Sequence, residues 1–203
     1  MARDKKFLSI LFGAAMTAIC TMSAASAQTP VPTDLIDDSF IAEMRDWLQK
    51  PVVQISVEAH NRRYNNLPQE EVDKLDKQWR KEREEKIQPL VAATLSSPLS
   101  MYLTQIQAAS GGLYTEIFVM DAIGLNVGQS AVTSDFWQGD EAKFQKTYPN
   151  GPDAVFIDEA EFHEGSKTWR AQVNLTVVNA KNEPIGAITT EINLTELARR
   201  HGS

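Results

Sequence analysis

The sequence has little of the residues that build disulfides, metal sites and nucleic-acid interfaces. Its 203 residues include one cysteine, Cys20, which excludes an intrachain disulfide and a zinc site made of several cysteines. Its three histidines form no ligand spacing. Lys and Arg total 20 against 27 Asp and Glu, so no excess of basic side chains is present to replace the counterions of phosphates. The composition therefore argues against a disulfide scaffold and against a nucleic-acid partner.

Motifs that carry catalysis are also missing. The sequence contains no nucleophile elbow, no phosphate loop and no HExxH pair. In one alternating run, Glu159, Glu161 and His163 place metal-ligand types on one face of a strand, although a charged, solvated edge strand explains the same pattern. We therefore expect a protein that is not an enzyme and that carries no metal or cofactor.

The first 27 residues have the pattern of a secretory signal peptide. Three basic residues within the first six positions precede a mostly apolar, uncharged run, and Ala25-Ser26-Ala27 supplies the small residues needed for cleavage before Gln28. A membrane anchor is disfavoured because the strongly apolar part is shorter than the ~20 residues of a spanning helix. A lipoprotein is disfavoured because the bulky Ile19 precedes Cys20.

Cleavage changes the composition of the working protein. It removes three basic residues, one acidic residue and Cys20, and leaves 176 residues with 17 basic and 26 acidic side chains, a net charge of −9. No later segment is apolar enough to cross a membrane. The sequence therefore predicts a periplasmic or secreted protein that does not insert into the membrane and whose fold is held by its core and any partner, without disulfides.

Residues 28–67 form an N-terminal segment with helical periodicity. After a proline-containing lead-in, Ser39 is expected to cap one helix, and Pro51 to open a second helix that ends near Tyr64. Pro68 then begins the second unit, residues 68–203.

Residues 69–95 predict one long helix with a kink at Pro89. Val72, Leu75 and Trp79 share one side of it, and the other sides are densely charged. Two interpretations of this stripe stay open: it packs the helix onto a sheet, or it forms the seam of a homodimer.

The C-terminal half alternates in the manner of strands. After a helix that begins at Ser97-Pro98, the clearest strand places apolar and polar residues on opposite faces from Thr168 to Val178. The connections between the last three strands are too short for crossover helices, which indicates an antiparallel sheet. The sequence therefore predicts an α+β fold in which long N-terminal helices precede an antiparallel five-stranded sheet. The expected strands are 114–120, 125–131, 154–162, 168–178 and 185–193, with a short helix from Asp140 and a closing helix over 194–200.

Three segments of the second unit, in their order, resemble the Cache (PDC) type of periplasmic sensor domain. The first is a strand that ends at Asp121 before a glycine turn, Ile123-Gly124-Leu125. The second is the aromatic and acidic segment 133–141 followed by Tyr148, and the third is Pro184-Ile185-Gly186-Ala187-Ile188. The resemblance covers residues 68–197. It implies a PAS-like sheet, a small-molecule pocket between that sheet and residues 134–148, and a sensory role.

The candidate pocket residues come from the covering segment and from the polar face of the clearest strand. Aromatic walls with a few placed polar groups are typical of small-molecule pockets, although Trp137 and its neighbours are equally suited to closing the core, and Asp121 to bonding the backbone of its own turn. The acidic groups favour a cationic or hydroxyl-rich ligand over a dicarboxylate, unless Arg170 faces the pocket. The candidate ligand-binding residues are Asp121, Asp135, Trp137, Gln138, Asp140, Tyr148, Arg170 and Gln172.

Two function classes follow. The leading hypothesis is an exported small-molecule-binding module that reports to a partner protein, with a homodimer or a membrane receptor as the candidate partners. The alternative is an envelope interaction protein without a ligand, which uses the long helix for dimerisation or docking.

Overall fold

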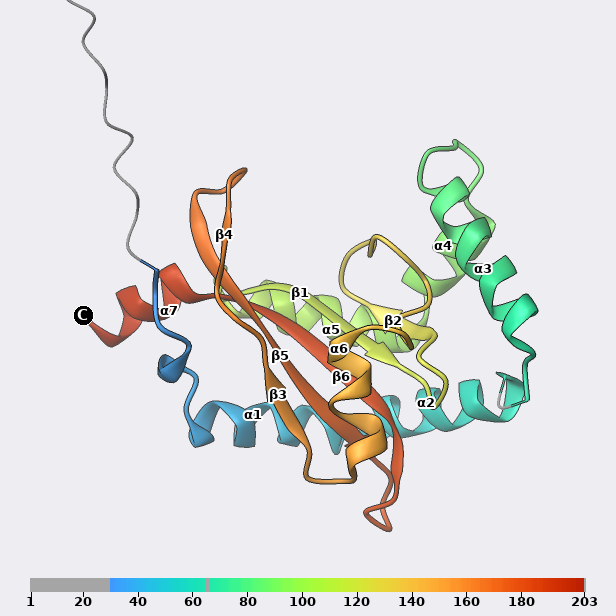
Figure 1. Ribbon diagram of the computed structural model, residues 1–203, viewed down its shortest axis with the longest axis horizontal. Helices are drawn as coiled ribbons and strands as arrows, with labels where there is room; N and C mark the ends of the chain where they lie inside the picture. Colours follow the sequence, from blue (N-terminus) through green and yellow to red (C-terminus); the bar gives the residue numbers. More distant parts are fainter. Residues whose placement is uncertain (1–29, 65, 203) are drawn as a thin grey trace, which may run out of the picture.

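The computed structural model describes residues 30–64 and 66–202, so the predicted leader and its cleavage site lie outside the described residues. The described chain has a helical N-terminal half followed by a strand-rich C-terminal half (Figure 1). The helical elements are η1 (Thr33–Leu35), α1 (Asp38–Leu48), α2 (Pro51–Tyr64), α3 (Gln69–Glu82), α4 (Pro89–Leu95), α5 (Pro98–Ala109), α6 (Ala142–Gln145), η2 (Tyr148–Asn150) and α7 (Leu194–His201). The strands are β1 (Tyr114–Met120), β2 (Asn126–Gln129), β3 (Val155–Ile157), β4 (Glu161–His163), β5 (Thr168–Val178) and β6 (Pro184–Asn193).

The strands form one antiparallel sheet in the order β2-β1-β6-β5-β3, with β4 also paired to β5. The predicted α+β class and the antiparallel sheet are confirmed. The sheet has six strands rather than five, because the strand expected over 154–162 is divided into β3 and β4. Both pieces pair with β5, and the backbone N–H of Asp158 between them still donates to the carbonyl of Gln172.

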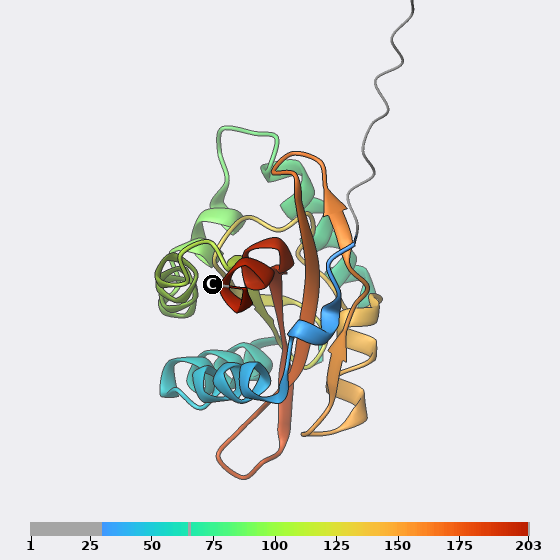
Figure 2. The same cartoon turned by 90° about the vertical axis from the view of Figure 1, so that its left-hand side faces the viewer.

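Helices α1, α2 and α5 cover one face of the sheet, whereas α6 lies on the other (Figure 2). Leu99 and Leu103 of α5 and Val53 and Val57 of α2 are buried against the alternating apolar residues of the strands. The segment 28–67 therefore shares a core with the sheet. The strand residues of this core include Ile117, Val119, Val173, Leu175, Ile188 and Ile192.

The residue expected to cap α1 is wrong by two positions. Asp37, not Ser39, occupies the N-cap, and its Oδ1 accepts from the backbone N–H of Phe40 at 3.0 Å. Ser39 lies inside the helix and donates its hydroxyl to the same carboxylate oxygen. Both are residue types that cap helices well, and the chain uses the earlier one.

The single long helix expected over 69–95 is wrong. Helix α3 ends at Glu82 and α4 begins at Pro89, with a non-helical loop between them. The buried Glu82 carboxylate stabilises the break, because its Oε2 accepts from the backbone N–H groups of Leu90 at 2.7 Å and Val91 at 3.1 Å. A carboxylate at these free N–H groups acts as the cap of α4.

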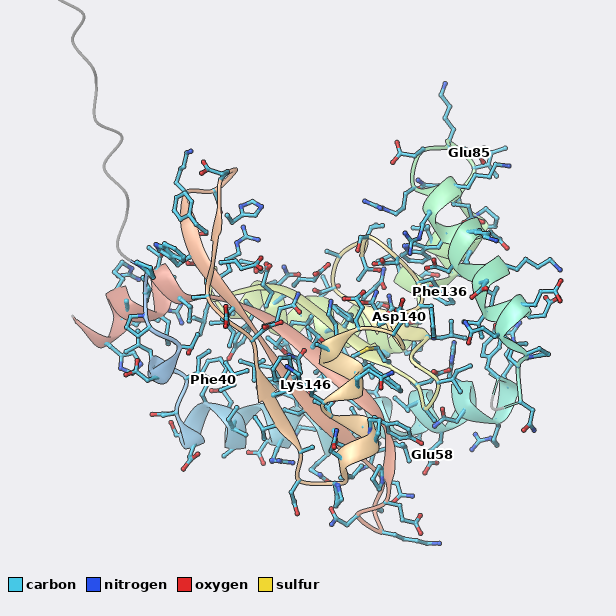
Figure 3. All side chains as sticks on the ribbon, viewed as in Figure 1. Phe40, Glu58, Glu85, Phe136, Asp140 and Lys146 are labelled. Carbon is cyan, nitrogen blue, oxygen red and sulfur yellow. The ribbon has the colours of Figure 1, made fainter. Side chains whose placement is uncertain are left out.

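The apolar stripe of α3 packs inside the protein. Trp79 is 0% exposed, stacks on Phe136 at a ring distance of 5.2 Å and donates its indole N–H to the carbonyl of Thr133 at 3.0 Å. Val72 is buried in the same cluster, and Figure 3 shows Phe136 beside α3. The stripe therefore anchors residues 133–137 rather than lying on the sheet, and its buried members Val72 and Trp79 are not exposed to form a dimer seam.

Candidate functional site

The sheet face opposite α1, α2 and α5 is divided into a closed half and an open half. In the closed half, Phe118 and Met120 of β1 are buried beneath Phe144 of α6, which stacks on Tyr148 at 5.4 Å. Lys146 holds the same short helix to β3, with its Nζ 4.0 Å from the ring centre of Phe156 (Figure 3). Helix α6 therefore covers only one end of this face.

At the other end the face becomes polar. Glu116 of β1 lies directly opposite Glu191 of β6, and Glu191 lies opposite Gln172 of β5. A cleft of about 250 Å³ opens between this row and the start of α6. The residues that line the cleft are Glu141, Ala142, Lys143, Asp158, Glu159, Glu161, Arg170, Ala171, Gln172 and Glu191.

The two cationic side chains of the cleft are already paired. Arg170 donates from Nη1 to Oε2 of Glu191 at 2.7 Å, and Thr115 also donates its hydroxyl to that carboxylate. Lys143 is 14% exposed and has its Nζ 2.9 Å from Oε2 of Glu141. Five carboxylates line the cleft against these two cations. The lining is therefore acidic, and the two cations are engaged within it.

Glu116 faces the same group of charges from β1. Burial raises the pKa of its carboxyl from 4.5 to about 7, and the like charge of Glu191 directly across the strand pair adds to the rise. Lys143 and Arg170 oppose the rise, whereas Asp135 adds to it. No ion pair or hydrogen bond to the Glu116 side chain occurs among residues 30–64 and 66–202. Glu116 is not among the lining residues, but next to the lining residue Glu191 it is a carboxylate that lacks a direct cationic partner in the described chain.

Gln172 offers the least committed polar group of the cleft. Its backbone carbonyl accepts from Asp158 and Asn174, but its side-chain amide has no hydrogen-bond partner among the described residues. A side-chain amide provides two donors and one acceptor oxygen. Gln172 is therefore free to bond a molecule in the cleft without breaking a contact of the protein.

Of the residues expected at a pocket, Arg170 and Gln172 line the cleft, and the other six lie elsewhere. Asp121 is 0% exposed and its Oδ1 accepts from the backbone N–H groups of Ile123 and Leu125, each at 2.9 Å. Its other oxygen lies 2.8 Å from Nδ1 of His60 on α2. Asp121 thus holds its own turn and joins that turn to α2.

Trp137 and Gln138 also make structural contacts. Trp137 donates its indole N–H to the carbonyl of Ile123 at 2.8 Å, and its ring lies so close to Gly139 that a Cβ there would be 2.4 Å from Nε1. Gln138 is buried, donates to the carbonyl of Asp135 at 3.1 Å and accepts from Lys143 at 3.4 Å. These two residues fasten the covering segment to the turn that follows β1.

The remaining three predicted residues are spread around the same segment. Oδ2 of Asp135 lies 3.3 Å from Nη2 of Arg80 on α3, and Asp140, labelled in Figure 3, is exposed. Tyr148 is half-buried at the closed end, where burial raises the pKa of its hydroxyl and the Asp121 charge adds to the rise. The structure therefore does not bring these six side chains together with Arg170 and Gln172.

Three charged residues in or beside the cleft were not among the predicted ligand-binding residues: Glu116, Lys143 and Glu191. Glu116 and Glu191 carry a detectable signal, because each is a charge inside an otherwise apolar or hydroxyl-bearing strand. Among the described residues no group of three or more His, Cys, Asp or Glu side chains is arranged to hold a metal ion. His163 instead bonds Ser166 at 2.9 Å in the turn after β4.

Comparison with known proteins gives structural neighbours only. No family model matches the chain, and no curated protein matches it significantly. The sensory domain of the Campylobacter jejuni chemoreceptor Tlp3 is matched with a TM-score of 0.40 and 13% identity, over 79% of this chain and 63% of that one. The ligand-binding domain of the Pseudomonas aeruginosa PAO1 amino acid chemoreceptor PctC, in complex with GABA, gives 0.41 and 13%, over 79% and 62%. The V. cholerae histidine kinase DctB sensor domain gives 0.36 and 16%, over 79% and 58%.

These neighbours are described as sensory, sensor or ligand-binding domains, the class of domain named by the resemblance to Cache-type sensors. The chain spans less than two thirds of the length of each of them. At these TM-scores and identities, no residue role and no ligand carries over to this chain. In the part of the chain that the structure describes, no helix has both the length and the apolar character needed to cross a membrane.

Proposed function

We propose that this chain is an exported, sensor-like module that binds a small polar molecule in the cleft between α6 and the sheet. The observation that carries the proposal is the uncovered polar row on a sheet face that is otherwise closed. Gln172 presents an unpaired amide there, beside the Glu116–Glu191 pair. A few polar groups placed on a rigid sheet are what orients a ligand.

The dimensions and charge of the cleft restrict the ligand. Its volume of about 250 Å³ is below the ~300 Å³ at which drug-sized pockets begin, so the ligand is small. Arg170 lines the cleft, but its guanidinium is engaged by Glu191. The excess of carboxylates therefore favours a cationic or hydroxyl-rich molecule over a dicarboxylate.

A cationic ligand would also relieve the charge conflict in the row. A positive group between Glu116 and Glu191 stabilises the ionised form of both carboxylates, and so lowers the raised pKa of Glu116. Binding then releases a proton just below pH 7, and the affinity rises as the pH increases toward about 7 and levels off above it. A neutral polyol gives no such dependence, which distinguishes the two ligand classes.

Export and signalling are part of the same proposal. The leader pattern of residues 1–27 supports a location outside the cytoplasm. The covering segment beside the cleft is bonded to the turn after β1, and that turn is bonded to α2 through His60 and Asn61. This chain of contacts is a physical route by which occupancy of the cleft reaches a helix on the opposite side of the sheet, where a partner protein can contact it.

A thermal-shift screen tests the binding proposal. The purified protein is heated with a panel of small amines, guanidino compounds and polyols, and a ligand that binds only the folded state raises the Tm. Gln172→Leu should abolish the shift while leaving the Tm of the free protein nearly unchanged, because the Gln172 side chain makes no hydrogen bond within the described residues that the change would remove.

Gln54→Leu is the matched control, since Gln54 lies on α2 on the other side of the sheet and its side chain bonds only Gln49 among the described residues. A hit that survives Gln172→Leu and is lost in Gln54→Leu would show binding elsewhere. A panel that produces no shift at any pH would count against the proposal. The alternative function, docking through the stripe of α3, has no observation in its favour, because Trp79 and Val72 are buried.

A further inference from the structure

The longest run of the sequence without a charged residue lies in the helices that follow α3. From Ile87 to Thr115, 29 consecutive residues include no Asp, Glu, Lys, Arg or His, in a chain whose residues are 23% charged. This run forms α4, α5 and the start of β1. Burial would explain an uncharged helix, but α5 is buried on one side only.

The outer side of α5 is exposed to solvent and remains uncharged. Pro98, Met101, Gln105 and Ala108 are all exposed, and their spacing of three and four residues places them along one side of the helix. Met101 is 54% exposed, one of few large apolar side chains so placed in the described chain. We call these four residues the neutral face. Figure 2 shows α5 at the outside of the helical layer.

We propose that the neutral face is where two copies of this chain associate about a two-fold axis. In a two-fold interface each residue near the axis meets its own copy, so the surface must be complementary to itself. On a chain with 27 acidic and 20 basic residues, most surfaces would place like charges opposite one another across the axis. The neutral face is free of that repulsion, whereas a partner of opposite charge would be drawn to the charged surfaces instead.

The side chains of the neutral face suit self-pairing. Gln105 has no hydrogen-bond partner in the described part of the chain, and an amide carries both donors and an acceptor, so two copies can bond each other. Met101 is flexible and adapts its shape to an identical neighbour. The face ends near Ser110, where Arg200 donates to the backbone carbonyl. A helix of 12 residues is about 18 Å long, so the contact is small and the dimer should be weak.

Sedimentation velocity over a hundredfold dilution of the purified protein tests the proposal. The wild type should shift from dimer to monomer as it is diluted. Met101→Glu and Met101→Lys should each be monomeric throughout, because each places like charges across the axis. Mixing the two variants should restore a dimer, since Glu then faces Lys. Val155→Glu is the matched control, because Val155 is 40% exposed on β3, away from α5.

Each outcome decides the proposal. A wild type that is monomeric at every concentration overturns it. A dimer that persists in Met101→Glu, with a circular dichroism spectrum like that of the wild type, shows that the interface lies elsewhere. A mixture of the two charged variants that stays monomeric excludes a two-fold axis at Met101. If Val155→Glu also dissociates the dimer, net charge rather than the neutral face controls association.

Discussion

The carboxyl of Glu116 provides a quantitative prediction about the cleft. Replacing Glu116 by glutamine keeps its shape and removes its charge. In the folded protein the pKa of Glu116 is about 7 instead of 4.5, because burial and Glu191 disfavour the ionised form. A carboxyl whose pKa is raised by folding stabilises the fold below pH 4.5, where it is protonated in both states, and loses that contribution as the pH rises through 7.

The size of the effect follows from the pKa. A tenfold change in an acid dissociation constant corresponds to about 1.4 kcal/mol, so the ionised carboxyl would cost about 3 kcal/mol at pH 8 if it were fully removed from solvent. Glu116 is only partly buried, and screening by water reduces the cost to about 2 kcal/mol. Glu116→Gln should therefore be more stable than the wild type by about 2 kcal/mol at pH 8 and nearly equal to it at pH 4.5.

Urea unfolding of both proteins between pH 4.5 and pH 8 measures this difference. The difference in unfolding free energy should grow with pH, most steeply between 4.5 and 7. Glu164→Gln is the control, because that side chain is exposed and its change should be small at every pH. If Glu116→Gln gives no gain at pH 8, or a gain that does not shrink in acid, the electrostatic reasoning about the cleft is refuted.

Three further predictions concern the fold and the processing of the chain. Glu82→Ala should destabilise the protein by about 1–3 kcal/mol and speed hydrogen exchange at Leu90 and Val91, because it uncaps α4; the exposed Glu84→Ala should do neither. Gly124→Ala should lower the free energy of chemical unfolding more than Gly151→Ala does. Both glycines have positive φ, but only at Gly124 would the new Cβ lie 2.5 Å from the Gly139 backbone. Equal losses in the two variants would contradict this close approach. Mass spectrometry of the exported protein should find Gln28 as its first residue, and an N-terminus retaining residues 1–27 would contradict the leader.

Local patterns predicted much of the sheet. The apolar pattern predicted β1 as Tyr114–Met120, the alternation of apolar and polar residues predicted β5 as Thr168–Val178, and the structure has the same bounds. It also placed Arg170 and Gln172 on the polar face that lines the cleft. Alternation is a property of each strand alone, so no knowledge of distant contacts was needed.

Features that depend on distant contacts were missed. The break between α3 and α4 depends on a carboxylate reaching eight and nine residues along the chain, which helical periodicity does not reveal. The meeting of Glu116 and Glu191 depends on the register between β1 and β6, two strands far apart in sequence. Trp137 was instead assigned a role that it does not have. An aromatic side chain suits a pocket wall, but the indole N–H of Trp137 donates to the carbonyl of Ile123 in the turn after β1.

The most direct test of the account is a map of where a small molecule binds. The protein is labelled with ¹⁵N and titrated with the strongest amine or polyol from the thermal-shift screen, while amide chemical shifts are recorded. The largest changes should cluster around the cleft, at Lys143, Gln172 and Glu191. Saturable changes centred on α3 or on α5, with the cleft residues unaffected, would contradict it.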